Sequence, residues 1–377
     1  MGRSGRLRLP PRSTPDLSAS RLPSLDVFRG ATIALMILVN NPGDWAKTYA
    51  PLLHAEWDGW TPTDLVFPFF LFIVGVAIPL SLAGREPSRE LHLRILRRAA
   101  ILLALGLLLA WAPFYTVVWE RARIPGVLQR IAVVYLFAAL AYLHLRWRAR
   151  LVLSLSLLAG YWVAMKLGGD LSPQGNLAFR LDHAILGAHT WRYAPGPGDP
   201  EGILSTVPAV VSALAGIFAG EWLRSPRSTT RKLVGFFVVG SVASGIGLLL
   251  HPYFPINKNL WSPSYVVFTT GVALLCLGLC HEMFDRRGAT WARPFEFFGK
   301  NSILAFVGSG LLVKALLLIK LDDPGGTPVS LQKVLYSSFY APHLPDYVAS
   351  LTWALSHVLL WLAVVWWLDR RRIYLKT

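Results

Sequence analysis

Long apolar runs, separated by short polar or basic segments, dominate the chain. A hydrocarbon core about 30 Å thick needs roughly 20 apolar residues in a helix. About ten stretches meet this requirement: 24–42, 62–83, 94–113, 125–145, 150–167, 204–223, 232–250, 264–284, 298–319 and 347–368. The pattern predicts an all-α, polytopic membrane protein with these helices in one bundle. We find no repeat of fixed period and no linker that would divide the bundle.

The positions of lysine and arginine predict how the bundle is oriented, because cytosolic loops carry an excess of both. Basic clusters all fall on one side when the N-terminus is cytosolic, and they lie at 3–21, 85–98, 146–150, 224–232, 286–300 and 370–376. Both termini are then cytosolic, and the long connections 43–61, 168–203 and 320–346 lie outside. Connections this long usually work as lids or binding loops, so we expect an acceptor substrate at the outer face.

Composition supports this class and excludes others. The chain has 377 residues, of which 54% are hydrophobic and 15% charged, with a formal net charge of +16. The basic residues form no continuous stripe and no nucleic-acid-binding motif, so we exclude a nucleic-acid partner. Residues 1–23 are basic, rich in Ser and Pro and without a signal-peptide pattern. They predict a disordered cytosolic tail ahead of a transmembrane domain at 24–377.

The two cysteines, Cys276 and Cys280, stand one helical turn apart inside an apolar run. Helix geometry disfavours a disulfide between them, and no second pair of ligands accompanies them. We therefore expect neither a disulfide nor a metal site.

Polar residues at membrane depth are costly and mark candidate functional positions. Asp26 and Arg29 share one helical face near the inner end of the first span, where they form either an ion pair or, through Arg29, a phosphate contact. Asn40 and Asn41 close the same span just before Pro42. A helix stop explains one amide better than two, so a functional role for at least one of them stays open.

The first outer connection contains His54, whose neutral imidazole could accept a proton near pH 7 or could simply be solvated. The sequence TPTD at 61–64 predicts a helix start, with Thr61 as the cap and Asp64 satisfying free N–H groups. Asp64 therefore has a structural explanation. It is also close in sequence to His54.

Further polar residues stand at other span ends. Arg130, inside the fourth span, needs an anionic partner, either a carboxylate or a substrate phosphate. Asp199 and Glu201 precede the sixth span as helix caps or as substrate ligands. The remaining candidates are Asn257, Lys258, Asn259 and Trp261 at the outer mouth of the eighth span, and Asn301 and Ser302 at the inner end of the ninth. An aromatic belt accounts for Trp261 and helix capping for Asn301.

Six ordered blocks together resemble a known family, the heparan-α-glucosaminide N-acetyltransferases and their bacterial relatives, which are transmembrane acyltransferases. The blocks are SLDVFRGATIALMILVNNPG, HAEWDGWTPTDLVFPFFLFIVG, RIPGVLQRI, DPEGIL, FPINKNLWSPSYV and NSILAFVG. The last 70 residues match more loosely, and the chain lacks the N-terminal luminal portion and first span of the animal enzymes. The resemblance implies transfer of an acetyl group from cytosolic acetyl-CoA to the amine of a glucosamine-like sugar across the membrane.

The resemblance also implies roles for individual residues. His54 would be the catalytic histidine and Asn40 its companion, with the imidazole removing a proton from the amine and the amide stabilising the oxyanion. Whether acetyl passes directly in a ternary complex or through an acetyl-histidine stays open. We assign substrate binding to Asp64, Arg130, Glu201, Asn257, Lys258, Asn259 and Trp261, and co-substrate binding to Arg29, Asn301 and Ser302.

A transporter or flippase of a glycan or lipid-linked sugar is the alternative, because it would use the same polar cavity without chemistry. Such proteins often consist of two related halves, and residues 24–167 do not align with 204–368. The expected location is the bacterial cytoplasmic (inner) membrane. The expected partners are membrane lipid, an amino-sugar acceptor and, in a homodimer, a second copy of the chain.

Overall fold

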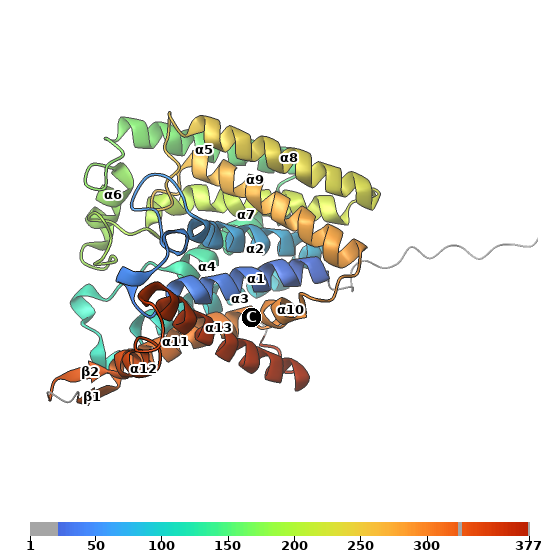
Figure 1. Cartoon of the computed structure of the whole chain (residues 1–377). Helices are drawn as coiled ribbons and strands as arrows, with labels where there is room; N and C mark the ends of the chain where they lie inside the picture. The colour runs from blue at the N-terminus through green and yellow to red at the C-terminus, as the bar shows by residue number, and fades with distance from the viewer. Residues whose placement is uncertain (1–21, 323–325, 376–377) are drawn as a thin grey trace, which may run out of the picture.

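The protein is a helical bundle that spans a membrane several times, which confirms the predicted fold class. The structure is a computed structural model that describes residues 22–322 and 326–375. The expected tail, residues 1–23, lies outside the described residues apart from Leu22 and Pro23, and Pro23 already belongs to the first helix. The main elements run mostly along one axis of the molecule (Figure 1).

The long helices match the predicted spans closely. They are α1 (Pro23–Asn40), α2 (Val66–Leu82), α3 (Arg89–Trp111), α4 (Val127–His144), α5 (Trp147–Leu167), α7 (Ile203–Arg224), α8 (Thr229–Leu250), α9 (Pro263–Cys280), α11 (Ser302–Leu318) and α13 (Asp346–Arg370). Within the described residues, eight helices are long and apolar enough to cross a membrane, and α10 with α11 forms a bent ninth candidate. The remaining one, α3, carries four arginines in its first half, at 89, 94, 97 and 98.

The ninth predicted span, 298–319, corresponds mainly to α11, and it begins just before a sharp bend that the hydrophobic pattern does not predict. The chain bends by 83° between α10 (Arg293–Lys300) and α11, with Asn301 at the break. Close packing against α1 explains the bend. A Cβ at Gly299 would lie 2.0 Å from the carbonyl oxygen of Asp26, and one at Gly30 would lie 1.6 Å from that of Phe295. Only glycine allows these two backbones to approach so closely, and α10 is thereby held across α1.

The centre of the bundle is formed by α2 and α7. Their backbones touch where Gly75 meets the carbonyl of Ala213 and where Gly216 meets that of Phe72. Leu71 and Leu214 are completely buried in this contact region. By contrast, α5 and α8 lie at the periphery, with 22% of their spanning residues buried against 67% for α7.

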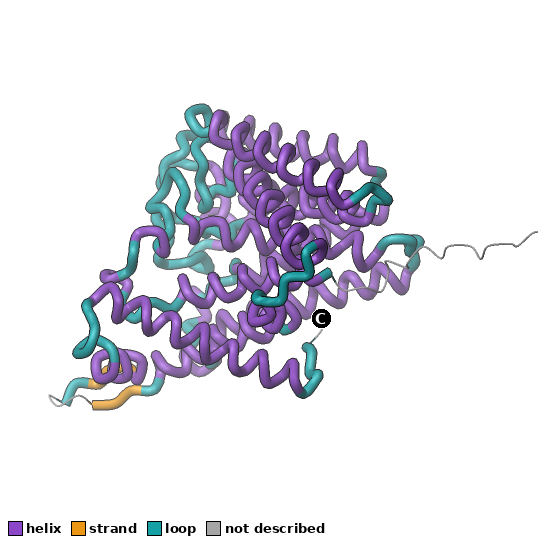
Figure 2. Tube along the Cα trace, turned by 45° about the vertical axis from the view of Figure 1, so that its right-hand side comes forward, coloured by secondary structure: helices purple, strands orange, loops and turns teal. Residues whose placement is uncertain are grey.

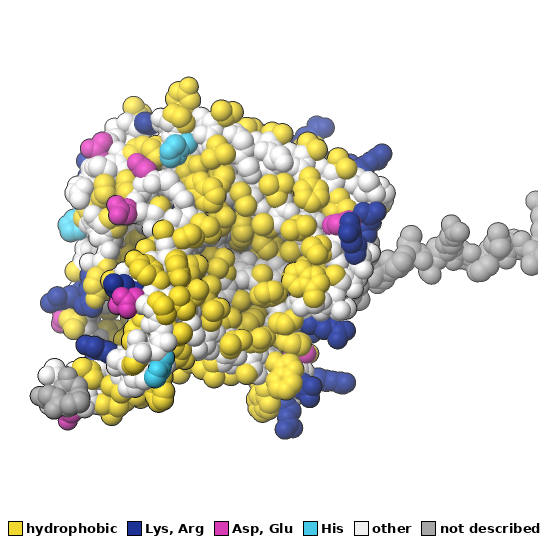
Figure 3. All heavy atoms as spheres, viewed as in Figure 1, with side chains coloured by type: hydrophobic (Ala, Val, Ile, Leu, Met, Phe, Trp, Pro, Cys, Tyr) yellow, Lys and Arg dark blue, Asp and Glu magenta, His cyan; other side chains and the backbone are white. Residues whose placement is uncertain are grey.

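The surface fits a molecule embedded in lipid. Hydrophobic side chains cover the middle of the face seen in Figure 3, and lysine and arginine gather toward its two ends. Apolar side chains of α8 such as Val238, Val242 and Leu249 are more than half exposed. In water such a surface would be unfavourable, whereas in a bilayer lipid chains cover it.

The three long connections have structure of their own. The first contains the 3₁₀ turns η1 (Trp45–Lys47) and η2 (Ala50–Leu52). The second contains α6 (Leu177–Leu186), and the third contains an antiparallel pair, β1 (Lys320–Asp322) with β2 (Pro328–Ser330), followed by α12 (Leu331–Phe339). Figures 1 and 2 place them at the same end of the bundle, as the alternation of spans requires. Shorter pieces are η3 (Pro62–Leu65), η4 (Phe114–Thr116), η5 (Trp119–Arg121) and the π-helix η6 (His281–Arg286).

Candidate active site

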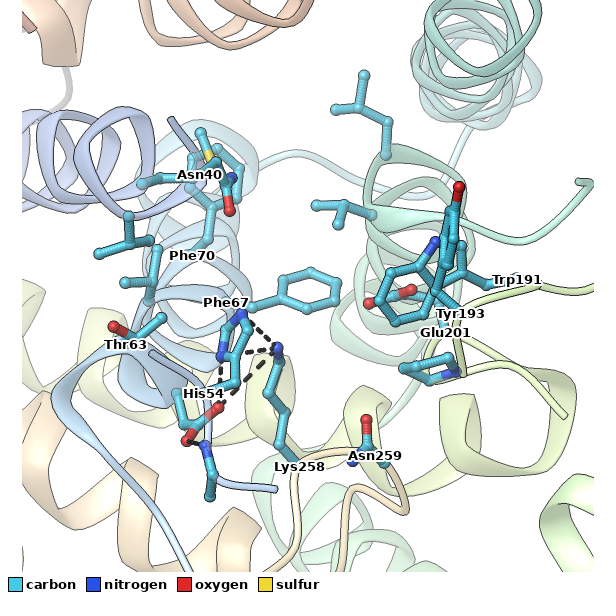
Figure 4. Close-up of a pocket in the computed structure, with 18 of the residues that line it drawn as sticks. Asn40, His54, Thr63, Phe67, Phe70, Trp191, Tyr193, Glu201, Lys258 and Asn259 are labelled. Carbon is cyan, nitrogen blue, oxygen red and sulfur yellow. Dashed lines mark hydrogen bonds and ion pairs between the residues drawn. The ribbon is translucent and has the colours of Figure 1, made fainter. Parts of the chain in front are cut away.

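A cavity of about 480 Å³ opens among the long connections and reaches into the bundle. Its mouth is polar and aromatic, whereas its inner wall is apolar. The polar and aromatic lining includes Asn40, His54, Glu56, Trp57, Asp64, Arg123, Trp191, Tyr193, Glu201, Lys258 and Asn259. The inner wall comes from α1, α2, α4 and α11, through residues such as Met36, Phe70, Ile131, Ile303 and Phe306. Figure 4 shows the labelled side chains around this space.

His54 and Asp64 form a hydrogen-bonded pair on one wall of the cavity. His54 Nδ1 lies 2.6 Å from Asp64 Oδ1. The carboxylate accepts, so the Nδ1–H donates and Nε2 is left with its lone pair. The Asp64 side chain is 1% exposed and that of His54 is 45% exposed. A buried carboxylate thus orients an imidazole that opens onto the cavity.

The predicted helix start explains why Asp64 is fixed. Pro62 and Asp64 belong to η3, and Thr61 and Asp64 form a capping box. Oδ2 of Asp64 accepts from the backbone N–H groups of Ala55 and Thr61, both at 3.0 Å. The capping role therefore uses one carboxylate oxygen and leaves the other for His54. The capping explanation for Asp64 is confirmed, and the same side chain also contacts His54 in the cavity wall.

Lys258 reaches the same imidazole from the connection between α8 and α9. Its Nζ lies 3.1 Å from Nε2 and 3.2 Å from Nδ1 of His54, and 3.9 Å from Asp64 Oδ1. Burial lowers the pKa of Lys258, and the nearby carboxylates of Asp64 and Glu201 oppose this shift. A lysine, a histidine and an aspartate therefore meet at one point of the cavity wall (Figure 4).

Asn257 and Trp261, predicted to bind substrate, shape the Lys258 loop and are not part of the cavity lining. Asn257 is buried, its Oδ1 accepts the N–H of Leu260 at 2.9 Å, and its Nδ2 donates to Asp58 at 3.2 Å. Trp261 is also buried and adopts a positive φ of 50°. The neighbouring Asn259 does line the cavity.

An acidic and basic cluster forms the opposite wall. Arg123 donates to both oxygens of Asp199, at 2.7 and 2.8 Å, and also pairs with Glu201. Burial would lower the pKa of Arg123, but these two carboxylates raise it overall. Burial would likewise raise the pKa of Glu201, yet the charge of Arg123 holds it below its usual value. Glu201 is therefore ionised at the cavity wall, with Asp199 buried behind it.

Arg130 lies close to this cluster but does not line the cavity. It is 2% exposed and donates to the carbonyl of Gly202 at 3.2 Å and to Ser205 Oγ at 2.5 Å. Its guanidinium lies 5.0 Å from the centre of the Trp261 ring. Among the described residues no carboxylate pairs directly with Arg130. Its guanidinium instead contacts a carbonyl, a hydroxyl and an aromatic face, and so joins the start of α7 to the Lys258 loop.

Comparison with known proteins shows the family to which the chain belongs. The sequence model described as "Heparan-alpha-glucosaminide N-acetyltransferase, catalytic" matches residues 21–247, more than half of the chain. The chain belongs to this family. Two curated relatives are each 30% identical to it, the heparan-alpha-glucosaminide N-acetyltransferases of Mus musculus and Homo sapiens. The alignments cover 78% and 76% of this chain but 54% and 52% of those proteins, so the chain spans about half the length of the relatives it matches.

The residues predicted to hold the co-substrate of this acetyltransferase family lie apart from the cavity. Arg29 pairs with Asp26 at 3.1 Å and contacts the carbonyl of Gly299 at 3.4 Å. Asn301 is buried and its side chain bonds to the backbone of Ile373 and Leu375, at 3.2 Å each. Arg29 lies roughly 16 Å along α1 from Asn40 at 1.5 Å per residue. Ser302 begins α11, whose next residue, Ile303, lines the inner wall.

The two asparagines at the end of α1 have different surroundings. Asn41 is buried and its Nδ2 donates to the carbonyl of Ile37 at 2.6 Å, so it closes the helix. Asn40 is exposed and lines the cavity (Figure 4). Only Asn40 is therefore placed to contact a molecule bound there.

Some cavity residues were missed from the sequence. Arg123, Trp191 and Tyr193 all line the cavity, and aromatic rings with nearby carboxylates are common in sugar-binding sites. Arg123 had a visible signal, because it is the first residue of the RIPGVLQRI block in the printed sequence. The aromatic pair had none, since it lies in a long connection whose path depends on tertiary contacts. Among the described residues, no three His, Cys, Asp or Glu side chains form a metal-binding group.

Proposed function

We propose that this protein transfers an acetyl group from cytosolic acetyl-CoA to the amine of a glucosamine-like sugar on the outer side of the membrane. The proposed membrane is the bacterial cytoplasmic membrane, with both termini inside. The observation that carries the proposal is the Asp64-bound imidazole of His54 opening onto a cavity that Asn40 also lines. Membership of the acetyltransferase family supports it independently.

The residues present can account for each bond that changes. The acceptor reacts as the neutral amine, its ammonium proton having passed to solvent. Its nitrogen attacks the thioester carbonyl and His54 Nε2 takes the N–H proton, while Asn40 donates a hydrogen bond to the oxyanion. The C–S bond then breaks and the imidazolium returns the proton to the thiolate, so the products are the amide and free CoA thiol.

The two parts of the cavity suit the two substrates. An aromatic and carboxylate-bearing mouth, with Trp191, Tyr193 and Glu201, suits a cationic amino sugar. The apolar inner wall suits the uncharged acetyl and thioester groups. We place the phosphates of CoA at the basic opposite end of the bundle, because a polyanion is attracted to clustered arginines.

Release of free thiol from acetyl-CoA in the presence of glucosamine tests the proposal on purified protein. We expect His54→Ala nearly to abolish release. Asn40→Ala should slow it on the order of a hundredfold or more, since one oxyanion donor typically contributes about 3–4 kcal/mol. His343→Ala, a histidine in the third connection that does not line the cavity, is the matched control and should leave release unchanged.

A transporter or flippase would release no thiol. Failure of the wild-type protein to release thiol with any amino sugar would overturn the proposal. Wild-type turnover in a folded His54→Ala protein would remove His54 from it.

A further inference from the structure

Resting on the proposed function, the geometry points to Lys258 as a positioning residue for the reaction. We propose that its ammonium group keeps the imidazole of His54 neutral, so that the base stays available near neutral pH. Sequence and resemblance suggested only a substrate contact for Lys258. The position of its Nζ beside His54 indicates an action through the base.

The ammonium group lies over the imidazole ring. Nζ is almost equally far from the two ring nitrogens, at 3.1 and 3.2 Å. These nitrogens flank one carbon, so an atom in the ring plane at equal distances would collide with ring atoms. Lys258 therefore faces the ring and leaves the in-plane lone pair of Nε2 open to a substrate.

Asp64 acts on the imidazole in the opposite direction to Lys258. Its Oδ1 lies 2.6 Å from Nδ1 of His54, and its side chain is almost completely buried. A buried carboxylate at hydrogen-bond distance favours the charged form of an imidazole. The positive charge of Lys258 has the opposite effect on the same ring.

Other charged groups lie in or near the cavity. Glu201 is paired with Arg123 on the opposite wall, and Asp58 accepts a hydrogen bond from Asn257. Arg130 does not line the cavity and donates to the carbonyl of Gly202, whereas Glu56 is part of the cavity lining. Within the part of the chain that the structure describes, Asp64 and Lys258 are the charged groups that contact the His54 ring. A carboxylate and an ammonium group therefore act on the same ring from different sides.

The loop holds Lys258 firmly in place. Asn257 braces it through Leu260 and Asp58, and its N–H donates to Ser262 Oγ at 3.0 Å. Trp261 packs edge-on to Phe67, with ring centres 5.0 Å apart, and donates to Ser212 at 3.1 Å. The Lys258 side chain itself is 19% exposed. This arrangement gives the Asn-Lys-Asn run and the buried Trp261 one purpose, which is to fix an ammonium group against His54.

The pH dependence of kcat/KM tests the inference. Lys258→Met removes the charge and keeps much of the length, whereas Lys258→Arg keeps the charge. In Lys258→Met, the fall of kcat/KM on the acidic side of the pH profile should move to higher pH by about one unit. This is the lower end of the range of pKa shifts that a neighbouring charge causes. In Lys258→Arg, kcat/KM should fall on the acidic side at the same pH as in the wild type. Lys47→Met removes a lysine that pairs with Asp346 elsewhere and should not change that pH.

A purely structural role for Lys258 would lower activity equally at every pH. If kcat/KM of Lys258→Met falls on the acidic side at the same pH as in the wild type, the inference is therefore overturned. Should Lys258→Met melt at a lower temperature than the wild type, Lys258→Gln provides a second neutral side chain for the same comparison.

Chemical modification gives a readout that does not need turnover. Diethyl pyrocarbonate reacts with neutral imidazole, and mass spectrometry of the peptide containing His54 follows the reaction across pH. The midpoint should be about one unit higher in Lys258→Met than in wild type, and equal midpoints would refute the role of Lys258. If the protein releases no thiol but the midpoints still differ, the proposed function fails while the electrostatic coupling stands.

Discussion

Asp64 shows how one side chain can serve stability and chemistry together. Its Oδ2 caps η3 through the N–H groups of Ala55 and Thr61, and its Oδ1 holds His54. Because both oxygens accept hydrogen bonds, only an ionised carboxylate satisfies all of these donors. An amide at this position offers one acceptor and one donor group.

Asp64→Asn should therefore impair both functions. If the amide oxygen faces the helix cap, its NH₂ faces Nδ1 and favours the histidine tautomer without a free Nε2. We expect the rate of thiol release to fall about a hundredfold or more, as when the orienting aspartate of a catalytic triad becomes asparagine. Asp44→Asn, which changes another capping aspartate of the outer connections, should leave the rate unchanged. A wild-type rate in Asp64→Asn would show that the pairing does not matter for turnover.

At the scale of secondary-structure elements, glycines decide how closely helices approach. The contact of α2 with α7 has almost no space at Gly75, where a Cβ would lie 2.0 Å from the carbonyl of Ala213. In α5, a Cβ at Gly160 would meet nothing within 4 Å. The same substitution should therefore have opposite effects at the two positions.

Gly75→Ala should lower the free energy of unfolding by about 1–3 kcal/mol, the usual range for inserting a methyl group into a tightly packed contact. Gly160→Ala should be neutral or stabilising by about 0.5–1 kcal/mol, because alanine loses less entropy in a helix than glycine. Thermal unfolding in detergent compares both proteins with wild type. Equal melting temperatures for the two variants would contradict the close packing of α2 and α7.

The long helices were predictable because a bilayer requires continuous apolar runs. The bend at Asn301 was not, because the polar residues Lys300, Asn301 and Ser302 mark a span end in the sequence without showing that two helices meet there at 83°. It depends on Gly30 and Gly299, which let α10 cross α1, and on the bonds from Asn301 to the chain at Ile373 and Leu375. These partners are distant in sequence, so no local pattern reveals them.

At the scale of the whole molecule, the proposal requires a defined orientation. The long connections and the cavity mouth must be outside, and the basic clusters inside. Alternation of the helices then places the connection between α2 and α3 inside and the one between α3 and α4 outside. Glu86 and Tyr115 are exposed in these two connections.

Single cysteines test this orientation in a protein whose Cys276 and Cys280 are changed to alanine. A membrane-impermeant thiol reagent added to intact cells should label Tyr115→Cys. It should label Glu86→Cys only after the cells are permeabilised. The reverse pattern would invert the topology and remove the outer-facing acceptor from the proposed function.

The sequence by itself determined the class of protein and most of its spans. Burial in lipid requires long apolar runs, and each run can be recognised from its own residues without knowledge of tertiary contacts. Six of the predicted site residues also line one cavity, namely His54, Asn40, Asp64, Glu201, Lys258 and Asn259. Tertiary structure alone decided that Arg130, Asn257 and Trp261 brace the wall, and that Lys258 meets His54, since residues 204 positions apart are brought together only by the packing of the bundle.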